Sequence, residues 1–184
     1  MALERKKTLN VFKDARGAWG SYDDYPVGPR GTDPMPHVSR NRVPQPFYLV
    51  SDHDQVIIQM SGEGRIDFEE MDPPSMRLTP GDTVYIPAGV PSRLIPDGEN
   101  VQIRLKAEPP GREAVAWYCG GCGDLVYAEE LGEGTLQDRY QDAVEAWNGD
   151  AARRTCGGCA AVHAPADLGD IAWREVAAAI RADG

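Results

Sequence analysis

The sequence lacks three features that would each place it in a large class of proteins. No stretch of its 184 residues approaches the ~20 consecutive apolar residues that a membrane span needs. Its first residues, Met1–Lys7, carry charges with no apolar segment after them, so no secretory signal is predicted. Basic residues number 19 against 29 acidic ones, and the net charge of −10 disfavours binding to nucleic-acid phosphates. We therefore expect a cytoplasmic protein with neither a membrane nor a nucleic acid as partner.

Cysteine is also scarce, and all four cysteines fall in two C-x-x-C units: Cys119 with Cys122, and Cys156 with Cys159. In a reducing compartment such pairs indicate a metal site rather than disulfides. The glycines between the cysteines permit a tight turn that brings both thiolates to one ion. Four cysteine ligands leave no open coordination position, so we predict a structural Zn²⁺, with iron in a rubredoxin-like arrangement as the redox alternative. Four unrelated thiols and a thioredoxin-type redox pair are the other interpretations.

Turn residues divide the chain into three parts. Residues 1–45 are rich in Gly, Pro, Asp and Arg and predict an irregular N-terminal arm. Residues 46–112 contain short apolar runs separated by turn signals, which predict the strands of a sandwich or barrel. These runs are Phe47–Ser51, Gln55–Met60, Arg65–Phe68, Ser75–Leu78, Thr83–Ile86 and Val101–Lys106. Residues 113–184 hold both cysteine units and two expected helices, one capped by Thr135 and one starting after Asp170.

A short motif specifies the kind of barrel. Gly81–Gly89 has the form G-x5-P-x-G, in which a turn, a buried strand and a Pro/Gly turn deliver the next side chains into a barrel mouth. It matches the second sequence motif of the cupins. The predicted fold class is therefore mainly β: a cupin-type β-barrel, or jelly roll, with a small C-terminal metal-knuckle and helical extension.

The ligands of a cupin metal centre are missing from their expected positions. In cupins that use a catalytic metal, a histidine follows the motif's last glycine by three residues, and here that position is Ser92. Counting back from Gly62 puts Gln55 at the glutamate position, and the histidine positions fall near Leu49. Serine and glutamine are poor replacements for imidazole and carboxylate ligands. The chain has only 3 histidines, so we expect no catalytic metal unless His37 reaches in from the N-terminal arm.

The cysteine region carries a more specific resemblance. Trp117-Tyr118-Cys119-x-x-Cys122-Gly123 and the second unit ending in Val162-His163 resemble bacterial 3-hydroxyanthranilate 3,4-dioxygenase, over about residues 38–163. The resemblance implies a cupin barrel, a separate knuckle metal and a homodimer. That family opens an aromatic ring with Fe(II) and O2. Its iron ligands would fall around Leu49, Gln55 and Ser92. A substrate-contacting glutamate of the family falls on Arg104, and Asn41 matches a substrate-contacting asparagine.

Three functions remain open on these residues. The favoured hypothesis is a metal-independent protein that binds or transforms a small carboxylated molecule, derived from an aromatic amino acid if the resemblance extends that far. His53 would be the general acid or base, because it is the group on that strand that titrates near neutrality. Arg93 and Arg104 would hold the carboxylate, for which a guanidinium fork is suited. Tyr85, Gln55 and Gln59 would orient the ligand.

The two alternatives differ from this in ways a structure can test. A non-catalytic binding or accessory protein should present an exposed apolar patch, whereas an enzyme should present a polar-lined pocket. An iron dioxygenase with altered ligands would need a second metal outside the cysteine site. Each of these residues also has an interpretation without a functional role. His53 would be a loop residue, Arg93 and Arg104 would be surface charges, and His163 would be a surface histidine.

Overall fold

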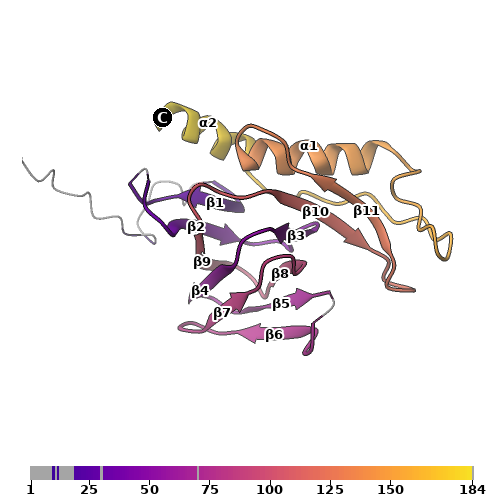
Figure 1. Ribbon diagram of the computed structural model, residues 1–184, viewed down its shortest axis with the longest axis horizontal. Coiled ribbons are helices and arrows are strands. Elements are labelled where there is room, and N and C mark those ends of the chain that lie inside the picture. The colour runs from indigo at the N-terminus through magenta and orange to yellow at the C-terminus, as the bar shows by residue number, and fades with distance from the viewer. Residues whose placement is uncertain (1–9, 11, 13–18, 30, 70, 184) are drawn as a thin grey trace, which may run out of the picture.

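The computed structural model describes residues 10, 12, 19–29, 31–69 and 71–183. Two antiparallel sheets stack face to face, and two helices cover one end of the stack (Figure 1). Most of residues 1–18, including the start from which the lack of a secretory signal was predicted, lies outside the described residues. No helix in the described part of the chain is both long and apolar enough to cross a membrane.

The described strands form a five-stranded and a six-stranded sheet. The first has the order β1 (Tyr22–Pro26), β2 (Met35–Asn41), β9 (Asn100–Lys106), β4 (Gln55–Ser61) and β7 (Thr83–Ile86). The second has the order β11 (Leu125–Glu130), β10 (Glu113–Tyr118), β3 (Tyr48–Ser51), β8 (Ser92–Pro96), β5 (Gly64–Phe68) and β6 (Ser75–Leu78). Two antiparallel sheets with these crossovers confirm the mainly β, cupin-type fold class.

All six predicted strands are present in the middle of the chain, but the prediction missed β8 there and the strands outside residues 46–112. Residues 1–45, predicted to be irregular, supply β1 and β2, and β2 pairs along its whole length with β9. Beyond residue 112, β10 pairs with β3 and therefore continues the barrel sheet into the cysteine region. The N-terminal part was missed because β2 alternates Val38 and Arg40 on one face with His37, Ser39 and Asn41 on the other, so neither face is apolar.

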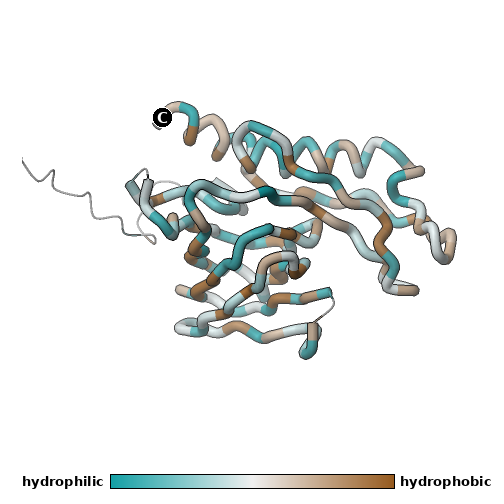
Figure 2. Tube along the Cα trace, in the orientation of Figure 1, coloured by the Kyte–Doolittle hydropathy of each residue, from teal (hydrophilic) through white to brown (hydrophobic). Residues whose placement is uncertain are grey.

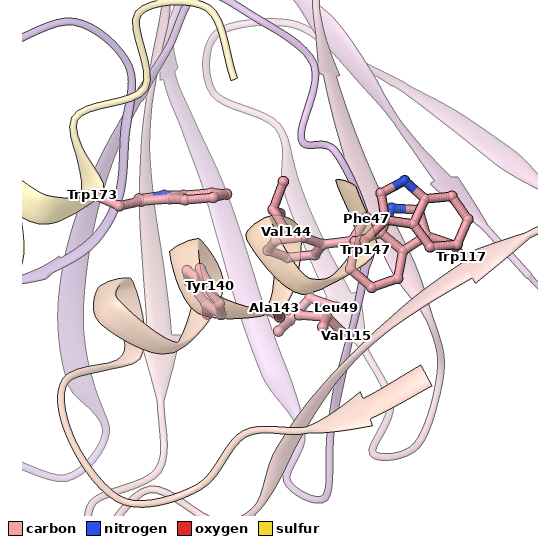
Figure 3. Close-up of a cluster of buried hydrophobic side chains, with 9 residues drawn as sticks. All are labelled: Phe47, Leu49, Val115, Trp117, Tyr140, Ala143, Val144, Trp147 and Trp173. Carbon is pink, nitrogen blue, oxygen red and sulfur yellow. The ribbon is translucent and has the colours of Figure 1, made fainter. Parts of the chain in front are cut away.

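Both predicted helices are present. α1 (Leu136–Gly149) begins after Thr135, and α2 (Trp173–Asp183) begins shortly after Asp170. Thr135 occupies the N-cap position but its hydroxyl donates to Asp138 Oδ2 at 2.6 Å rather than accepting from a backbone amide. The apolar stripe of α1 packs against β3 and β10, and Trp173 joins it there (Figure 3). The residues of this cluster are Phe47, Leu49, Val115, Trp117, Tyr140, Ala143, Val144, Trp147 and Trp173.

Two further apolar clusters lie away from the middle of the barrel, where the buried side chains are polar. One cluster seals the end formed by β5, β6 and β7, and contains Ile57, Ile66, Phe68, Leu78, Val84, Ile86 and Leu94. The other packs α2 on β1, β2 and β9, through Tyr22, Tyr25, Val38, Val101 and Val176. Hydrophilic and hydrophobic residues are interspersed along the strands of both sheets (Figure 2).

Candidate functional site

The four cysteines lie together at the end of the molecule beyond β10. Cys119 and Cys122 sit in the turn between β10 and β11, and Cys156 and Cys159 in a turn after α1. Their four sulfur atoms all lie within 4.8 Å of one another, with Cys119 Sγ 3.6 Å from Cys159 Sγ and Cys122 Sγ 3.5 Å from Cys156 Sγ. Four thiolates at these spacings can surround one ion tetrahedrally.

The two cysteine turns are built in the same way. In each turn the first cysteine donates its backbone N–H to a residue beyond the second cysteine, and its carbonyl accepts from the residue just after that cysteine. The last position has a positive φ in both turns: Gly123 at 80° and Ala160 at 59°. Backbone N–H groups of Cys122 and Gly121 also donate to the Cys119 sulfur and lower the pKa of its thiol to about 6. The backbone thus favours the thiolate at Cys119, whereas hydrogen bonding among the neighbouring sulfurs raises the pKa of the Cys122 and Cys159 thiols.

Two of the amide side chains expected to contact a substrate, Gln59 and Asn41, are bonded to other residues of the barrel. Gln59 Nε2 donates to the carbonyls of Ser61 and Gly62, at 2.9 and 3.0 Å. Gln59 Oε1 accepts from Gln102 Nε2 at 2.7 Å. Asn41 donates to Asn100 Oδ1 at 3.1 Å. Gln59 and Asn41 are buried; the Gln59–Gln102 bond joins β4 to β9, and the Asn41–Asn100 bond joins β2 to β9.

Arg104 lies in the interior and faces an acid of the protein. Its Nε is 3.6 Å from Asp24 Oδ1, and Asp24 Oδ2 is 3.2 Å from the ammonium of Lys106. Lys106 also forms an ion pair with Glu113, which belongs to the opposite sheet. Tyr140 of α1 donates to the same oxygen of Asp24 at 3.1 Å. Two cations and two acids therefore fill the space between the sheets, and we call Asp24, Arg104, Lys106 and Glu113 the interior ion cluster.

The charges of this cluster depend on one another. Burial alone would raise the pKa of Asp24, but Arg104 and Lys106 lower it well below its usual range. Neighbouring Asp23 is less well compensated, and burial raises its pKa to about 6 despite the hydrogen bond it accepts from Trp173. Sequence reasoning missed Asp24, Lys106 and Glu113. The signal was present in Arg104 and Lys106, two basic residues at alternate positions of a strand, and so on one face.

His53 and Tyr85 do not face the interior. His53 lies in the turn between β3 and β4, its side chain is 51% exposed, and its Nε2 is 3.9 Å from Asp52 Oδ1. Tyr85 is 56% exposed on β7, and its hydroxyl donates a hydrogen bond to the Asp54 carboxylate. A hollow beside His53 and Gln55 has a volume of about 10 Å³, room for one water molecule at most. The expected reaction centre around these side chains is therefore not assembled.

Arg93 is separated from Arg104. It extends from β8, its Nε donates to the carbonyl of Gln45 at 2.8 Å, and its guanidinium lies 5.9 Å from the ring centroid of Tyr48. It lines a pocket against Trp117 and Tyr118, whereas Arg104 borders a hollow of essentially no volume next to Asp24. The two arginines therefore do not form one carboxylate clamp.

The resemblance places iron ligands at three barrel positions, Leu49, Gln55 and Ser92. Leu49 and Ser92 are directly paired across β3 and β8, and Gln55 starts β4. None offers an imidazole or a carboxylate. His37 lies opposite Arg104 across β2 and β9, and burial lowers the pKa of its ring to about 4. Across the described residues the four cysteines are the one group of His, Cys, Asp and Glu side chains with a metal-binding arrangement.

No protein-family model matches the chain. The sequence is 23% identical over 126 residues to 3-hydroxyanthranilate 3,4-dioxygenase of Yarrowia lipolytica, a match that spans 66% of this chain and 68% of that enzyme. It is 33% identical over 70 residues to the enzyme of the same name from a Jannaschia species, but spans only 39% of it. A cupin-2 domain protein from Shewanella frigidimarina is similar in structure over 54% of this chain and 93% of its own, with 19% identity and a TM-score of 0.45. The curated relatives thus carry the name 3-hydroxyanthranilate 3,4-dioxygenase, and the chain is a divergent relative of these enzymes with a cupin-type fold.

Proposed function

We propose that this chain binds a small carboxylated molecule and has no catalytic iron in its barrel. The observation that carries the iron-free part of this proposal is the interior ion cluster, and the carboxylated ligand comes from the resemblance. Lys106 joins Asp24 on one sheet to Glu113 on the other, and Arg104 lies beside Asp24 in the same space. Both acids are thus already neutralised by cations of the protein.

Two physical arguments support the absence of an iron centre. An Fe(II) dioxygenase site needs imidazole and carboxylate ligands and open coordination positions, and Leu49, Gln55 and Ser92 supply neither ligand type. A divalent ion placed near Arg104 and Lys106 would also meet two positive charges in a medium of low dielectric constant. The hollow beside Gln55 and Lys106, of about 10 Å³, has no space for a substrate ring.

The cysteine cluster has a separate role in this proposal. A closed tetrahedron of four thiolates leaves no position for a substrate, so the ion is structural and we assign it as Zn²⁺. The ion would join the β10–β11 turn to the segment between α1 and α2. These two segments are distant from each other in sequence. We further propose a cytoplasmic location, since reduced thiolates need a reducing compartment, and a homodimer as in the family it resembles.

Oxygen uptake tests this function directly. The purified chain, incubated anaerobically with Fe(II) and then given 3-hydroxyanthranilate in aerated buffer, should consume no more oxygen than the Fe(II) control without protein. The same assay on an Arg104→Gln variant should give the same trace. Iron-dependent oxygen consumption by the wild-type chain that disappears in the Arg104 variant would contradict the proposal, because it would place ring cleavage in the barrel interior.

A further inference from the structure

A pocket of about 430 Å³ lies outside the barrel interior, between the barrel and the chain that follows the cysteine cluster. We call it the outer pocket. The aromatic and charged or ionisable residues that line it are Arg93, Trp117, Tyr118, Trp147, His163 and Asp167. The volume falls within the ~300–1,000 Å³ that small-molecule sites usually have. It exceeds the hollow beside His53 and Gln55, of about 10 Å³, by more than an order of magnitude.

The aromatic walls of the outer pocket are held in place by the core. Trp117 and Trp147 stack with ring centroids 4.7 Å apart and planes 4° from parallel. They form one end of the buried cluster under α1, remote from Trp173 (Figure 3). Tyr118 packs edge-on against Tyr48, with ring centroids 5.3 Å apart. Because these rings are fixed by packing, a flat ligand can bind without ordering the side chains around it.

Two polar atoms on the lining residues lack partners. Trp117 Nε1 and His163 Nε2 are shielded from solvent and have no hydrogen bond to any residue the structure describes. An indole N–H can only donate, so Trp117 needs an acceptor that the protein does not supply. The backbone of His163 is fixed by two hydrogen bonds with Arg154, at 2.8 and 2.6 Å, so the ring is held beside the pocket.

Arg93 supplies the charge. Its Nε is used by the Gln45 carbonyl at 2.8 Å, but no carboxylate in the described part of the chain forms an ion pair with its guanidinium. The one acid on the lining, Asp167, is exposed, and its Oδ1 accepts from the backbone N–H of Gly169 at 2.9 Å. Water screens an exposed charge more strongly than a half-buried one. The pocket therefore favours an anion at Arg93.

We propose that the outer pocket is the binding site for an aromatic carboxylate. The carboxylate accepts from the Arg93 guanidinium, the aromatic body packs against the Trp117, Tyr118 and Trp147 walls, and an acceptor of the ligand meets Trp117 Nε1. This inference rests on the proposed function for its carboxylated ligand. It places the binding site beside Trp117 and Tyr118 at the end of β10, and not in the barrel interior.

Calorimetric titration of the zinc-loaded full chain tests the site. The probes are benzoate and 2-naphthoate, with benzamide and 2-naphthamide as neutral counterparts of the same shape. At least one carboxylate should bind saturably, and its amide about tenfold more weakly or worse, because it lacks the charge that Arg93 recognises. Arg93→Gln should weaken the carboxylate by about tenfold or more, and Trp117→Phe, which keeps a ring but removes the N–H, by a smaller factor. Arg65→Gln is the matched control, since Arg65 is an exposed arginine on neighbouring β5 that is paired with Asp67 at 2.9 Å.

The outcomes separate this inference from the proposed function. Binding that Arg93→Gln and Trp117→Phe weaken while Arg65→Gln does not, in variants with unchanged melting temperature, supports the outer pocket. No saturable binding by either carboxylate overturns it, and so does binding that survives Arg93→Gln but is lost in Arg104→Gln. Neither result bears on the oxygen-uptake assay, which tests the iron-free barrel without using Arg93.

Discussion

The ammonium of Lys106 lies 3.2 Å from Asp24 Oδ2 and also pairs with Glu113 on the opposite sheet. One side chain of β9 thereby connects β1 to β10 through the interior of the barrel. Arg104, two positions earlier on β9, lies beside the same Asp24, with its Nε 3.6 Å from Asp24 Oδ1.

Removing the Lys106 charge should destabilise the fold strongly. Lys106→Met keeps much of the buried volume but leaves Asp24 and Glu113 with Arg104 as the remaining cation of the cluster. Breaking one partner of a buried ion pair typically costs about 3–5 kcal/mol in the free energy of unfolding. Urea denaturation of the zinc-loaded protein measures the loss. Lys106→Met combined with Asp24→Asn should recover part of it, and a single variant as stable as the wild type would show that the cluster does not hold the sheets together.

Asp23 should weaken the fold at neutral pH. Burial raises the pKa of Asp23 from 3.8 to about 6, so the folded chain holds this proton more tightly than the unfolded chain. Stability from this group is therefore full below pH ~4, falls as the pH rises to about 6, and stays low above that. Asp23→Asn keeps an oxygen for the Trp173 N–H, which lies 2.9 Å away in the wild type. It should raise the free energy of unfolding at pH 7.5 by on the order of 2 kcal/mol relative to the wild type, and much less at pH 4.

The pH dependence of Asp23 must be measured as a difference between wild type and variant, because His37 titrates over about the same pH range. Burial lowers the pKa of His37 to about 4, so its contribution to stability rises with pH over about the same range in which that of Asp23 falls. The raw pH profile of the wild type combines both. Subtracting the Asp23→Asn profile from the wild-type profile isolates Asp23, and a difference that does not change between pH 4 and 7.5 would refute the raised pKa.

His53 should be dispensable. Its side chain is half exposed in the turn between β3 and β4, and a hollow of only about 10 Å³ lies beside it. His53→Ala should change the free energy of unfolding by less than ~0.5 kcal/mol, as is usual for an exposed position, and leave carboxylate binding unchanged. Calorimetry and urea denaturation on the same variant check both. A tenfold loss of binding would restore His53 to the site that the sequence predicts for it.

The sequence was most informative where apolar residues alternate with polar ones. Ser75–Leu78 and Thr83–Ile86 have the same bounds in the structure as in the prediction, and both helices begin where their apolar stripes begin. The cysteine cluster was also predictable, because two C-x-x-C turns constrain their sulfurs locally and need only to be brought together by the fold.

The polar interior could not be predicted from hydrophobic patterns. On β9 the residues buried between the sheets are Asn100, Gln102, Arg104 and Lys106, while the intervening Ile103 and Leu105 are partly exposed. A pattern argument assigns the apolar face of a strand to the core. Here the polar face is the buried one, because its side chains are paired with Asp24, Gln59 and Glu113. These partners come from other strands, so the pattern of β9 alone does not reveal them. The same reversal hid β1, whose Asp23 and Asp24 look like turn residues in the sequence.

Metal content of the purified chain and of a Cys156→Ser variant is the most direct test of an iron-free barrel. Elemental analysis should find about one zinc per wild-type chain, bound by the four cysteines, and little of any metal in the variant, where one ligand is missing. The variant should also lose thermal stability, because the ion joins two segments distant in sequence. Iron that persists in Cys156→Ser at a stoichiometric level would contradict the account, because the barrel would then hold a second metal centre.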